Sequence, residues 1–324
     1  MSVIIDDLYQ ELIQYCGLIE QLKFRCTNKF HRNKINSDLL GEYFHYKRKW
    51  NKIYFSNTCK YGYLNLAKFL YYTTSMSIEY ISTAFVDSCE NGHFEIAKWL
   101  YQLDADIHIN NDCAFRKSCE NGHIDIAKWL YKFGVDIRAK NGYAFDLACT
   151  NGHFEVAIWL HQLCADNDDG HAFKKSCENG HIEIAQWLHA PDAIINHSYE
   201  DAFIMACKNG HIEIAQWLQQ FGVDIHVEND SGFRLSCEKG HFEIAKWLYQ
   251  LGANIHARND YAFILSCENG DIEIAKWLYQ LGVDIHINDD YVFKYCCRNG
   301  NFEITKWLYS IGNIDIHVDE RLCL

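Results

Sequence analysis

The sequence predicts an all-α fold, an α-solenoid of nine stacked helix–turn–helix repeats with short loops behind an N-terminal helical head. A glycine returns every 30 residues along most of the chain, with one interval of 28. A phenylalanine stands seven residues before each of these glycines, so a whole block recurs rather than a single residue. The anchor glycines are Gly62, Gly92, Gly122, Gly152, Gly180, Gly210, Gly240, Gly270 and Gly300. Units repeated at one period pack mainly on their neighbours, so we expect an elongated array instead of a globular core.

The first helix of each repeat is predicted before the anchor glycine. Phe115, Ser118 and Cys119 illustrate the pattern, because their i, i+3 and i+4 spacing places them on one face of a helix. The same cysteine position recurs as Cys59, Cys89, Cys119, Cys149, Cys177, Cys207, Cys237, Cys267 and Cys297. Packed helices lie about 8–10 Å apart, whereas bridged cysteines need Cα atoms within about 7 Å. We therefore expect small, buried, free thiols in a reducing compartment.

The second helix is predicted after the anchor glycine, where Ile126, Ala127 and Leu130 form an apolar stripe at helical spacing. A tryptophan recurs beside this stripe. In five repeats a second glycine should end the helix in a left-handed conformation: Gly134, Gly222, Gly252, Gly282 and Gly312. Three repeats carry another residue there, and we expect a strained or reshaped helix end at Asp104, Cys164 and Asp192. Neither helix is expected to exceed about ten residues, so stability must come from stacking.

The recurring run N-G-H-[FI]-[ED]-[IV]-A-K-W-L-Y-x-x-G-[AV]-D-I resembles the body of an ankyrin repeat. The resemblance covers residues 51–318, and SCENGH-x-EIAKWLY is similar to ankyrin arrays encoded by giant DNA viruses of amoebae. Two features depart from the family. Cys113-Ala114-Phe115-Arg116 replaces the usual T-P-L-H opening, and 30 residues replace the usual repeat of about 33. The missing residues fall between Asp136 and Ala144, so the family's projecting hairpin should be shortened here.

Two series of histidines recur in the repeats. The first follows the anchor glycine: His93, His123, His153, His181, His211 and His241. The resemblance implies that these side chains hydrogen-bond backbone in neighbouring loops. Zinc ligands must converge at about 2.0–2.1 Å from the metal, which residues a whole repeat apart should not do. The second series begins the loop, where it is expected to orient the loop, with direct partner contact as the alternative: His108, His226, His256, His286 and His317.

A position six residues before the anchor glycine changes charge from repeat to repeat. It reads Arg116, Asp146, Lys174, Ile204, Arg234, Ile264 and Lys294. A position that varies this widely is expected to face solvent or a partner rather than the core. We predict that these residues contact a protein partner on the concave face, and unconstrained surface is the alternative. No G-x-x-x-x-G-K-[ST], H-E-x-x-H or G-x-S-x-G motif occurs, so we expect no enzyme, cofactor or metal site.

Charge divides the chain. Residues 1–50 carry a net charge of +2, whereas residues 51–324 carry −15. An array this acidic should repel phosphate backbones, so nucleic acid is not an expected partner. No stretch approaches the roughly 18–20 apolar residues of a membrane span, and Asp6 and Asp7 stand where a signal peptide is basic. We expect a monomeric, intracellular protein of the cytoplasm, that of a host cell if the viral resemblance holds, and not a secreted one.

The helical head, residues 1–50, lacks the repeat and has two interpretations. It can cap the first repeat, since terminal units must present a polar outer face. Alternatively, the order Leu8-x-x-Glu11-Leu12-Ile13 is similar to an F-box, the module that docks substrate receptors onto ubiquitin ligases, although the usual Leu-Pro start is absent. The second interpretation implies a substrate-recruiting receptor of a ubiquitin ligase.

The remaining boundaries follow the repeat. Residues 51–80 form a degenerate first repeat, residues 81–318 form eight further repeats, and residues 319–324 form a tail. The array is irregular near 164–200, where a loop has lost two residues and His189-Ala190-Pro191-Asp192 replaces the usual helix end. Proline cannot continue a helix, so a bend is expected there. Whether that bend serves function or reflects drift stays open.

Overall fold

The computed structural model describes residues 55–73, 75–163, 169–189 and 198–312. Within these ranges the chain forms helices joined by turns, with no strand. The predicted all-α solenoid is confirmed. The helical head, the tail, His317, Cys164 and Asp192 lie outside the described residues, so the expectations for them stay predictions.

The helices alternate as the repeat predicts. Residues 55–60 are helical and pair with α3 (Leu64–Thr73). The first helices of the later repeats are α4 (Ile78–Glu90), α6 (Ile109–Glu120), α8 (Ala139–Thr150), α10 (Asp169–Glu178), α12 (Ser198–Asn209), α14 (Val227–Glu238), α16 (Ala257–Asn269) and α18 (Ile287–Asn299). The second helices are α5 (Phe94–Tyr101), α7 (Ile124–Tyr131), α9 (Phe154–Leu163), α11 (Ile182–Leu188), α13 (Ile212–Gln219), α15 (Phe242–Gln250), α17 (Ile272–Gln280) and α19 (Phe302–Ile311).

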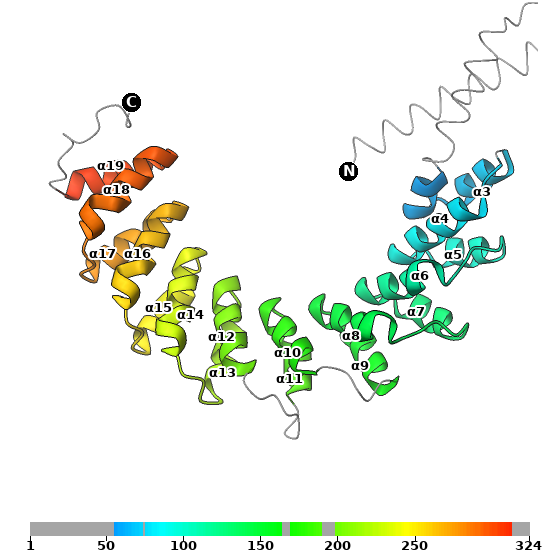
Figure 1. Cartoon of the computed structure of the whole chain (residues 1–324), viewed down its shortest axis with the longest axis horizontal. Helices are drawn as coiled ribbons and strands as arrows, with labels where there is room; N and C mark the ends of the chain where they lie inside the picture. Colours follow the sequence, from blue (N-terminus) through cyan, green and yellow to red (C-terminus); the bar gives the residue numbers. More distant parts are fainter. Residues whose placement is uncertain (1–54, 74, 164–168, 190–197, 313–324) are drawn as a thin grey trace, which may run out of the picture.

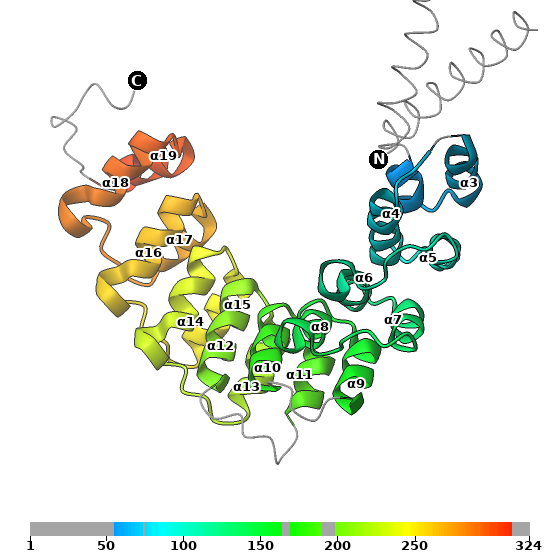
Figure 2. The same ribbon diagram turned by 45° about the vertical axis from the view of Figure 1, so that its right-hand side comes forward.

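The stacked pairs form an open arc (Figure 1, Figure 2). In the view of Figure 1 the first helices lie along its inner side and the second helices along its outer side. Neighbouring first helices pack closely on one another, whereas neighbouring second helices touch far less. Residue size explains the difference. Small buried residues such as Ala114 and Ser118 let first helices approach, while a tryptophan on each second helix from α5 to α19 holds its neighbour away. The result is curvature toward the first helices.

The core is a ladder of aromatic contacts between repeats. The phenylalanine seven residues before the anchor glycine is buried in every repeat. Phe85 contacts Trp129 of the next repeat with ring centroids 6.2 Å apart, and Phe115 contacts Trp159 in the same way at 6.3 Å. Each pair of this kind is worth about 0.5–1.5 kcal/mol beyond the area it buries. A repeat therefore gains much of its stability from its neighbour, as short helices require.

The anchor glycine is required for two reasons. Gly92 has a φ of 79°, which side chains rarely adopt, and a Cβ there would lie 2.7 Å from the imidazole of His123. That imidazole crosses to the preceding repeat, where its Nε2 donates to the carbonyl oxygen of Glu90 at 3.0 Å. The same contact joins His93 to Lys60 at 2.9 Å. The expected backbone hydrogen bond is confirmed for His93, His123, His153, His181 and His211.

The helix ends partly follow expectation. Gly134, the glycine expected to end a second helix, has a φ of 81°, and Gly222, Gly252 and Gly282 are also left-handed. Asp104 takes a φ of 61° without being glycine, so its expected strain is present. Gly312 is the exception, because its φ of −107° and ψ of 142° are those of extended backbone. The left-handed end predicted for α19 is wrong.

The first helices exceed the predicted length because a left-handed turn precedes several of them. Asn110, Asn111 and Asp112 have φ values of 53°, 56° and 55°, and the right-handed helix of α6 begins only after them. The same turn precedes the helix in α14 and α16. It occupies the loop where the family's hairpin was expected to be shortened. Among the residues described, no helix is long and apolar enough to cross a membrane.

Candidate partner-binding surface

The surface that faces the inside of the arc is a single stripe on the first helices. It consists of the residues nine, six, five and two positions before the anchor glycine, which share one helix face. The buried residues eight, seven, four and three positions before the glycine occupy the opposite face. We call these residues of α4 to α18 the inner stripe. In α8 it is Tyr143, Asp146, Leu147 and Thr150.

The inner stripe is electrically balanced on an otherwise acidic array. Its eight basic residues are Arg116, Lys117, Lys174, Lys175, Lys208, Arg234, Lys294 and Arg298. Its eight acidic residues are Asp87, Glu90, Glu120, Asp146, Glu178, Asp201, Glu238 and Glu268. The net charge of −15 in residues 51–324 therefore lies outside the inner stripe.

The seven predicted contact residues differ in exposure. Lys294 is exposed, and Asp146 and Lys174 are partly exposed. The expected exposure is wrong for the other four, which are only 4–7% exposed: Arg116, Ile204, Arg234 and Ile264. All seven lie in the inner stripe, but four of them can offer a partner little surface. Partner contact itself stays a prediction.

The two buried arginines have a structural task that the sequence pattern did not reveal. Arg116 donates from Nε to the carbonyl oxygen of Asn111 at 3.2 Å and from Nη2 to that of Asn110 at 3.0 Å. Arg234 makes the same two bonds to Asn229 and Glu228, at 2.9 and 3.0 Å. These carbonyls belong to the left-handed turns, so each arginine joins the turn to the helix that follows it. Burial lowers the pKa of Arg234.

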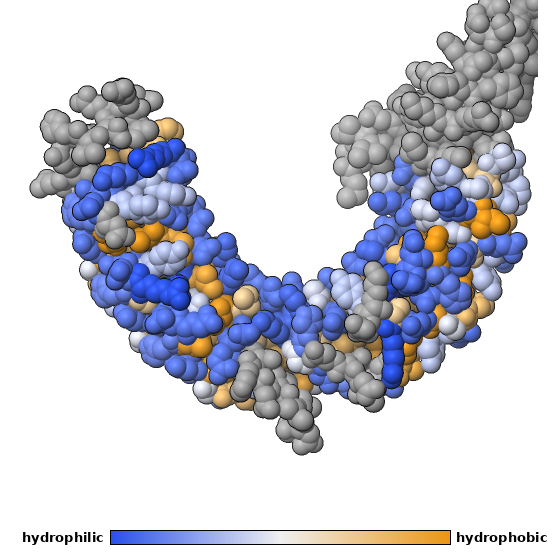
Figure 3. Space-filling view, in the orientation of Figure 1, coloured by the Kyte–Doolittle hydropathy of each residue, from blue (hydrophilic) through white to orange (hydrophobic). Residues whose placement is uncertain are grey.

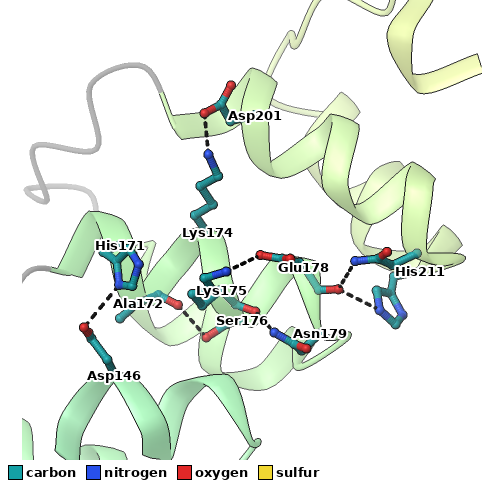
Figure 4. A network of polar contacts seen from close by, with 11 residues as sticks. Asp146, His171, Ala172, Lys174, Lys175, Ser176, Glu178, Asn179, Asp201 and His211 are labelled. Carbon is teal, nitrogen blue, oxygen red and sulfur yellow. Dashed lines mark hydrogen bonds and ion pairs between the residues drawn. The ribbon is translucent and has the colours of Figure 1, made fainter. Parts of the chain in front are cut away.

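Charged residues of the inner stripe pair across neighbouring repeats (Figure 4). The imidazole Nδ1 of His171 on α10 lies 3.2 Å from the Asp146 carboxylate on α8. The ammonium of Lys174 on α10 lies 2.6 Å from the Asp201 carboxylate on α12. Such half-exposed pairs add about 0–1 kcal/mol each. Their main consequence is that the charges between α8 and α12 already have partners within the chain.

Comparison with known proteins identifies the repeat. The family model described as ankyrin repeats, three copies, matches residues 55–141, 88–172, 115–199, 173–259 and 233–320. The chain belongs to the ankyrin-repeat family. Among solved structures, it is similar to the human ASB11 ankyrin repeat domain, with 18% identity and a TM-score of 0.47 over 60% of this chain and 96% of that one. No curated protein matches the chain significantly.

A histidine–aspartate pair organises four loops of this ankyrin array. The Nδ1 of His108 lies 2.7 Å from Oδ1 of Asp112, and Oδ2 of Asp112 accepts the backbone N–H of Asp136 in the next repeat at 2.9 Å. One carboxylate thus joins its own loop to the following one. His226 pairs with Asp230 at 2.8 Å in the same way. The second histidine series therefore has the loop-orienting contact that was expected.

Three exposed tyrosines of the inner stripe were not among the contact residues predicted from the sequence. Tyr143, Tyr261 and Tyr291 stand nine residues before their anchor glycines and are 46%, 38% and 40% exposed. The signal that could have found them was available, because this position also varies widely from repeat to repeat. It reads Thr83, Cys113, Tyr143, His171, Asp201, Ser231, Tyr261 and Tyr291. Tyrosine is enriched in protein interfaces, so these side chains are the better contact candidates.

The thiols of the array have low reactivity, because most of them are buried and protonated. Burial raises the pKa of Cys59 and of Cys177 to about 12, so both stay protonated near neutral pH. The other cysteines of the series are also buried, except Cys297, which is partly exposed. In the part of the chain that the structure describes, no three His, Cys, Asp or Glu side chains converge to hold a metal ion.

Proposed function

We propose that this ankyrin array is a non-enzymatic scaffold that binds a protein partner through its inner stripe. Ankyrin repeats generally serve protein–protein interaction, and stacked repeats create the extended concave surface that such binding uses. The observation that carries the proposal is the contrast between the two faces of each first helix. The buried face repeats the same residues, whereas the inner stripe varies, is charge-balanced, and exposes tyrosines such as Tyr143 and Tyr291.

Affinity purification of the full chain with mass spectrometry tests this proposal. A variant combining Tyr143→Ala, Lys174→Glu and Lys294→Glu changes exposed or half-exposed inner-stripe residues without touching the core. We expect it to lose the partner that the natural chain captures. Thermal unfolding followed by circular dichroism would show that the variant remains folded.

The matched control changes the outer helices by the same charge. Lys98→Glu and Lys246→Glu alter half-exposed residues of α5 and α15, which form local ion pairs with Glu95 and Glu243 within the described part of the chain. This control should retain the partner. Capture that survives the inner-stripe variant, or that is lost in the outer one, would remove the inner stripe as the binding face.

A second candidate function rests on the F-box-like order of the helical head. In that case the chain is a ubiquitin-ligase receptor, with the head holding the ligase and the array holding the substrate. The full chain should then co-purify the ligase's F-box-binding adaptor, and Leu12→Lys with Ile13→Lys should abolish this while leaving inner-stripe binding intact. An adaptor that is absent from the natural chain's complexes leaves the cap interpretation.

We also propose that the array works as a monomer in the cytoplasm of a host cell. The similarity of its repeats to those of amoeba-infecting giant viruses supports the host assignment. Many buried free thiols, such as Cys119 and Cys237, support a reducing compartment, because an oxidising one favours disulfide-bonded cysteines. Fluorescence imaging of the tagged chain in infected cells and sedimentation of the purified chain test these two points.

A further inference from the structure

The inner stripe changes character along the arc. Between α4 and α10 it is mainly charged, and its charges have partners inside the array. Besides the pairs between α8, α10 and α12 (Figure 4), Lys117 on α6 lies 3.4 Å from the carboxylate of Glu90 on α4 and 3.0 Å from that of Glu120. A ligand that used these charges would first have to separate existing pairs. We therefore expect the inner stripe between α4 and α10 to contribute little to the affinity for a charged ligand.

Between α14 and α18 half of the inner-stripe residues are apolar or aromatic. We call Leu235, Tyr261, Leu265, Tyr291 and Tyr295 the tyrosine patch. Tyr261 and Tyr291 are exposed, Leu235 and Tyr295 are partly exposed, and Leu265 forms the buried floor. The rings of Tyr291 and Tyr295 lie 5.9 Å apart. Tyrosines held by rigid helices offer large contact area at low entropic cost, which is why they concentrate in interface hot spots.

Two cations border the tyrosine patch on α18. Lys294 and Arg298 are both exposed. Lys294 donates to the carbonyl oxygen of Asp289, a contact that leaves its positive charge without a carboxylate. Arg298 has no ion pair with any described residue, and it stands at the position where five of the eight inner-stripe residues are glutamate. The acid nearest in the stripe, Glu268, accepts the Tyr291 hydroxyl at 3.0 Å.

We propose that the partner presents an acidic segment with an aromatic or aliphatic anchor, which seats on the tyrosine patch. The anchor packs among Tyr261, Tyr291 and Tyr295, and the acidic residues pair with Lys294 and Arg298. The rest of the array, with its net charge of −15, repels such a segment, so the charge pattern directs it to this end of the inner stripe. This inference rests on the proposed function and adds the location and chemistry of the contact.

Peptide selection against the full chain tests the proposal. Phage displaying random peptides are enriched on the immobilised protein, and the enriched peptides are synthesised and titrated by fluorescence anisotropy. We expect them to combine Asp or Glu with aromatic or aliphatic residues and to bind more weakly as salt increases. Enrichment of basic peptides would overturn the proposal.

Variants locate the binding site with position-matched controls. Tyr261→Ala with Tyr291→Ala should weaken binding about tenfold or more, and Lys294→Glu with Arg298→Glu should do the same. Thr150→Glu and Lys208→Glu change the positions on α8 and α12 that are equivalent to Arg298, and each should leave the affinity unchanged. The charge-reversal pair alters only exposed residues, so it remains informative if the tyrosine variant fails to fold.

The outcomes separate this inference from the proposed function. If the α8 and α12 controls weaken binding as much as the patch variants do, the inner stripe binds but the assignment to the tyrosine patch is overturned. If peptides bind and no inner-stripe variant changes their affinity, the proposed function fails together with this inference.

Discussion

The ring of Phe94 lies edge-on to the indole of Trp129 in the next repeat, with ring centroids 5.5 Å apart. The same contact joins Phe154 to Trp187 at 5.8 Å and Phe242 to Trp277 at 5.3 Å. Phe302 holds this position in the last described repeat, where it is 75% exposed. One residue type at one repeat position therefore occurs both with and, among the described residues, without a following tryptophan, so the chain contains its own comparison for the strength of stacking.

Phe94→Ala should lower the free energy of unfolding by about 1–2 kcal/mol, because it removes half-buried apolar area and an aromatic pair. Phe302→Ala should change it by no more than about 0.5 kcal/mol, as exposed substitutions usually do. Urea unfolding followed by circular dichroism measures both. Equal losses for the two variants would show that stacking on the next tryptophan is not the source of the stability.

Arg116→Ala should destabilise the array by about 1–3 kcal/mol, because it removes two hydrogen bonds that the buried, charged guanidinium donates to the left-handed turn. Lys294→Ala changes the same repeat position where the side chain is exposed, and should cost about 0.5 kcal/mol at most. Thermal unfolding distinguishes the two. A neutral Arg116→Ala would mean that water satisfies the turn and that the position is free to serve binding.

Stability should fall as the pH drops below about 6.5, the ordinary pKa of histidine. Burial lowers the pKa values of His153 and His211 in the folded chain, and positive charge on the histidines at the same position in the neighbouring repeats lowers them further. The unfolded chain therefore takes up these protons at higher pH than the folded chain. The contribution is fully present above the unfolded pKa and is lost as pH falls toward the folded values.

The control for this pH dependence comes from the chain itself. Asn301 occupies the same repeat position, and its side-chain Nδ2 donates to the carbonyl oxygen of Glu268 at 3.0 Å without being able to titrate. His153→Asn with His211→Asn should preserve the contacts between repeats and flatten the dependence of stability on pH. Urea unfolding between about pH 7 and pH 5 measures it, and an unchanged slope would contradict the assignment to these histidines.

Hydrogen exchange should reveal two cooperative blocks, residues 51–163 and 200–310, with earlier opening across 164–200. Stability in a solenoid sums unit and interface terms, so the weakest interface opens first. α11 is the shortest of the labelled helices at seven residues, and the backbone hydrogen bond of His189 to Ala185 is its last. Uniform protection across α9, α10, α11 and α12 would make the array a single cooperative unit.

The sequence by itself determined the repeat, the two helices of each unit, the buried phenylalanines and the ankyrin family. It could do so because burial on a helix follows a period that adjacent residues reveal, and nine copies make that period unmistakable. The backbone contact of His123 was expected from the resemblance to ankyrin repeats, whereas the need for glycine at Gly92 came from the structure. A residue that recurs at the same position in every repeat is expected to contact the same type of neighbour in each.

Only the tertiary structure decided which variable positions are open to a partner. Arg116 and Lys294 vary in the same column, yet one is buried over a left-handed turn and the other is exposed. Such a turn, built from Asn and Asp, has no hydrophobic periodicity. The sequence pattern therefore does not predict that its carbonyl groups accept hydrogen bonds from an arginine. Pairs such as Lys174 with Asp201 join residues of different repeats, and their distance depends on how the repeats stack. A position whose residue type varies between repeats lies outside the repeated core. Whether its side chain is exposed depends on the contacts it makes with the neighbouring turn and repeat.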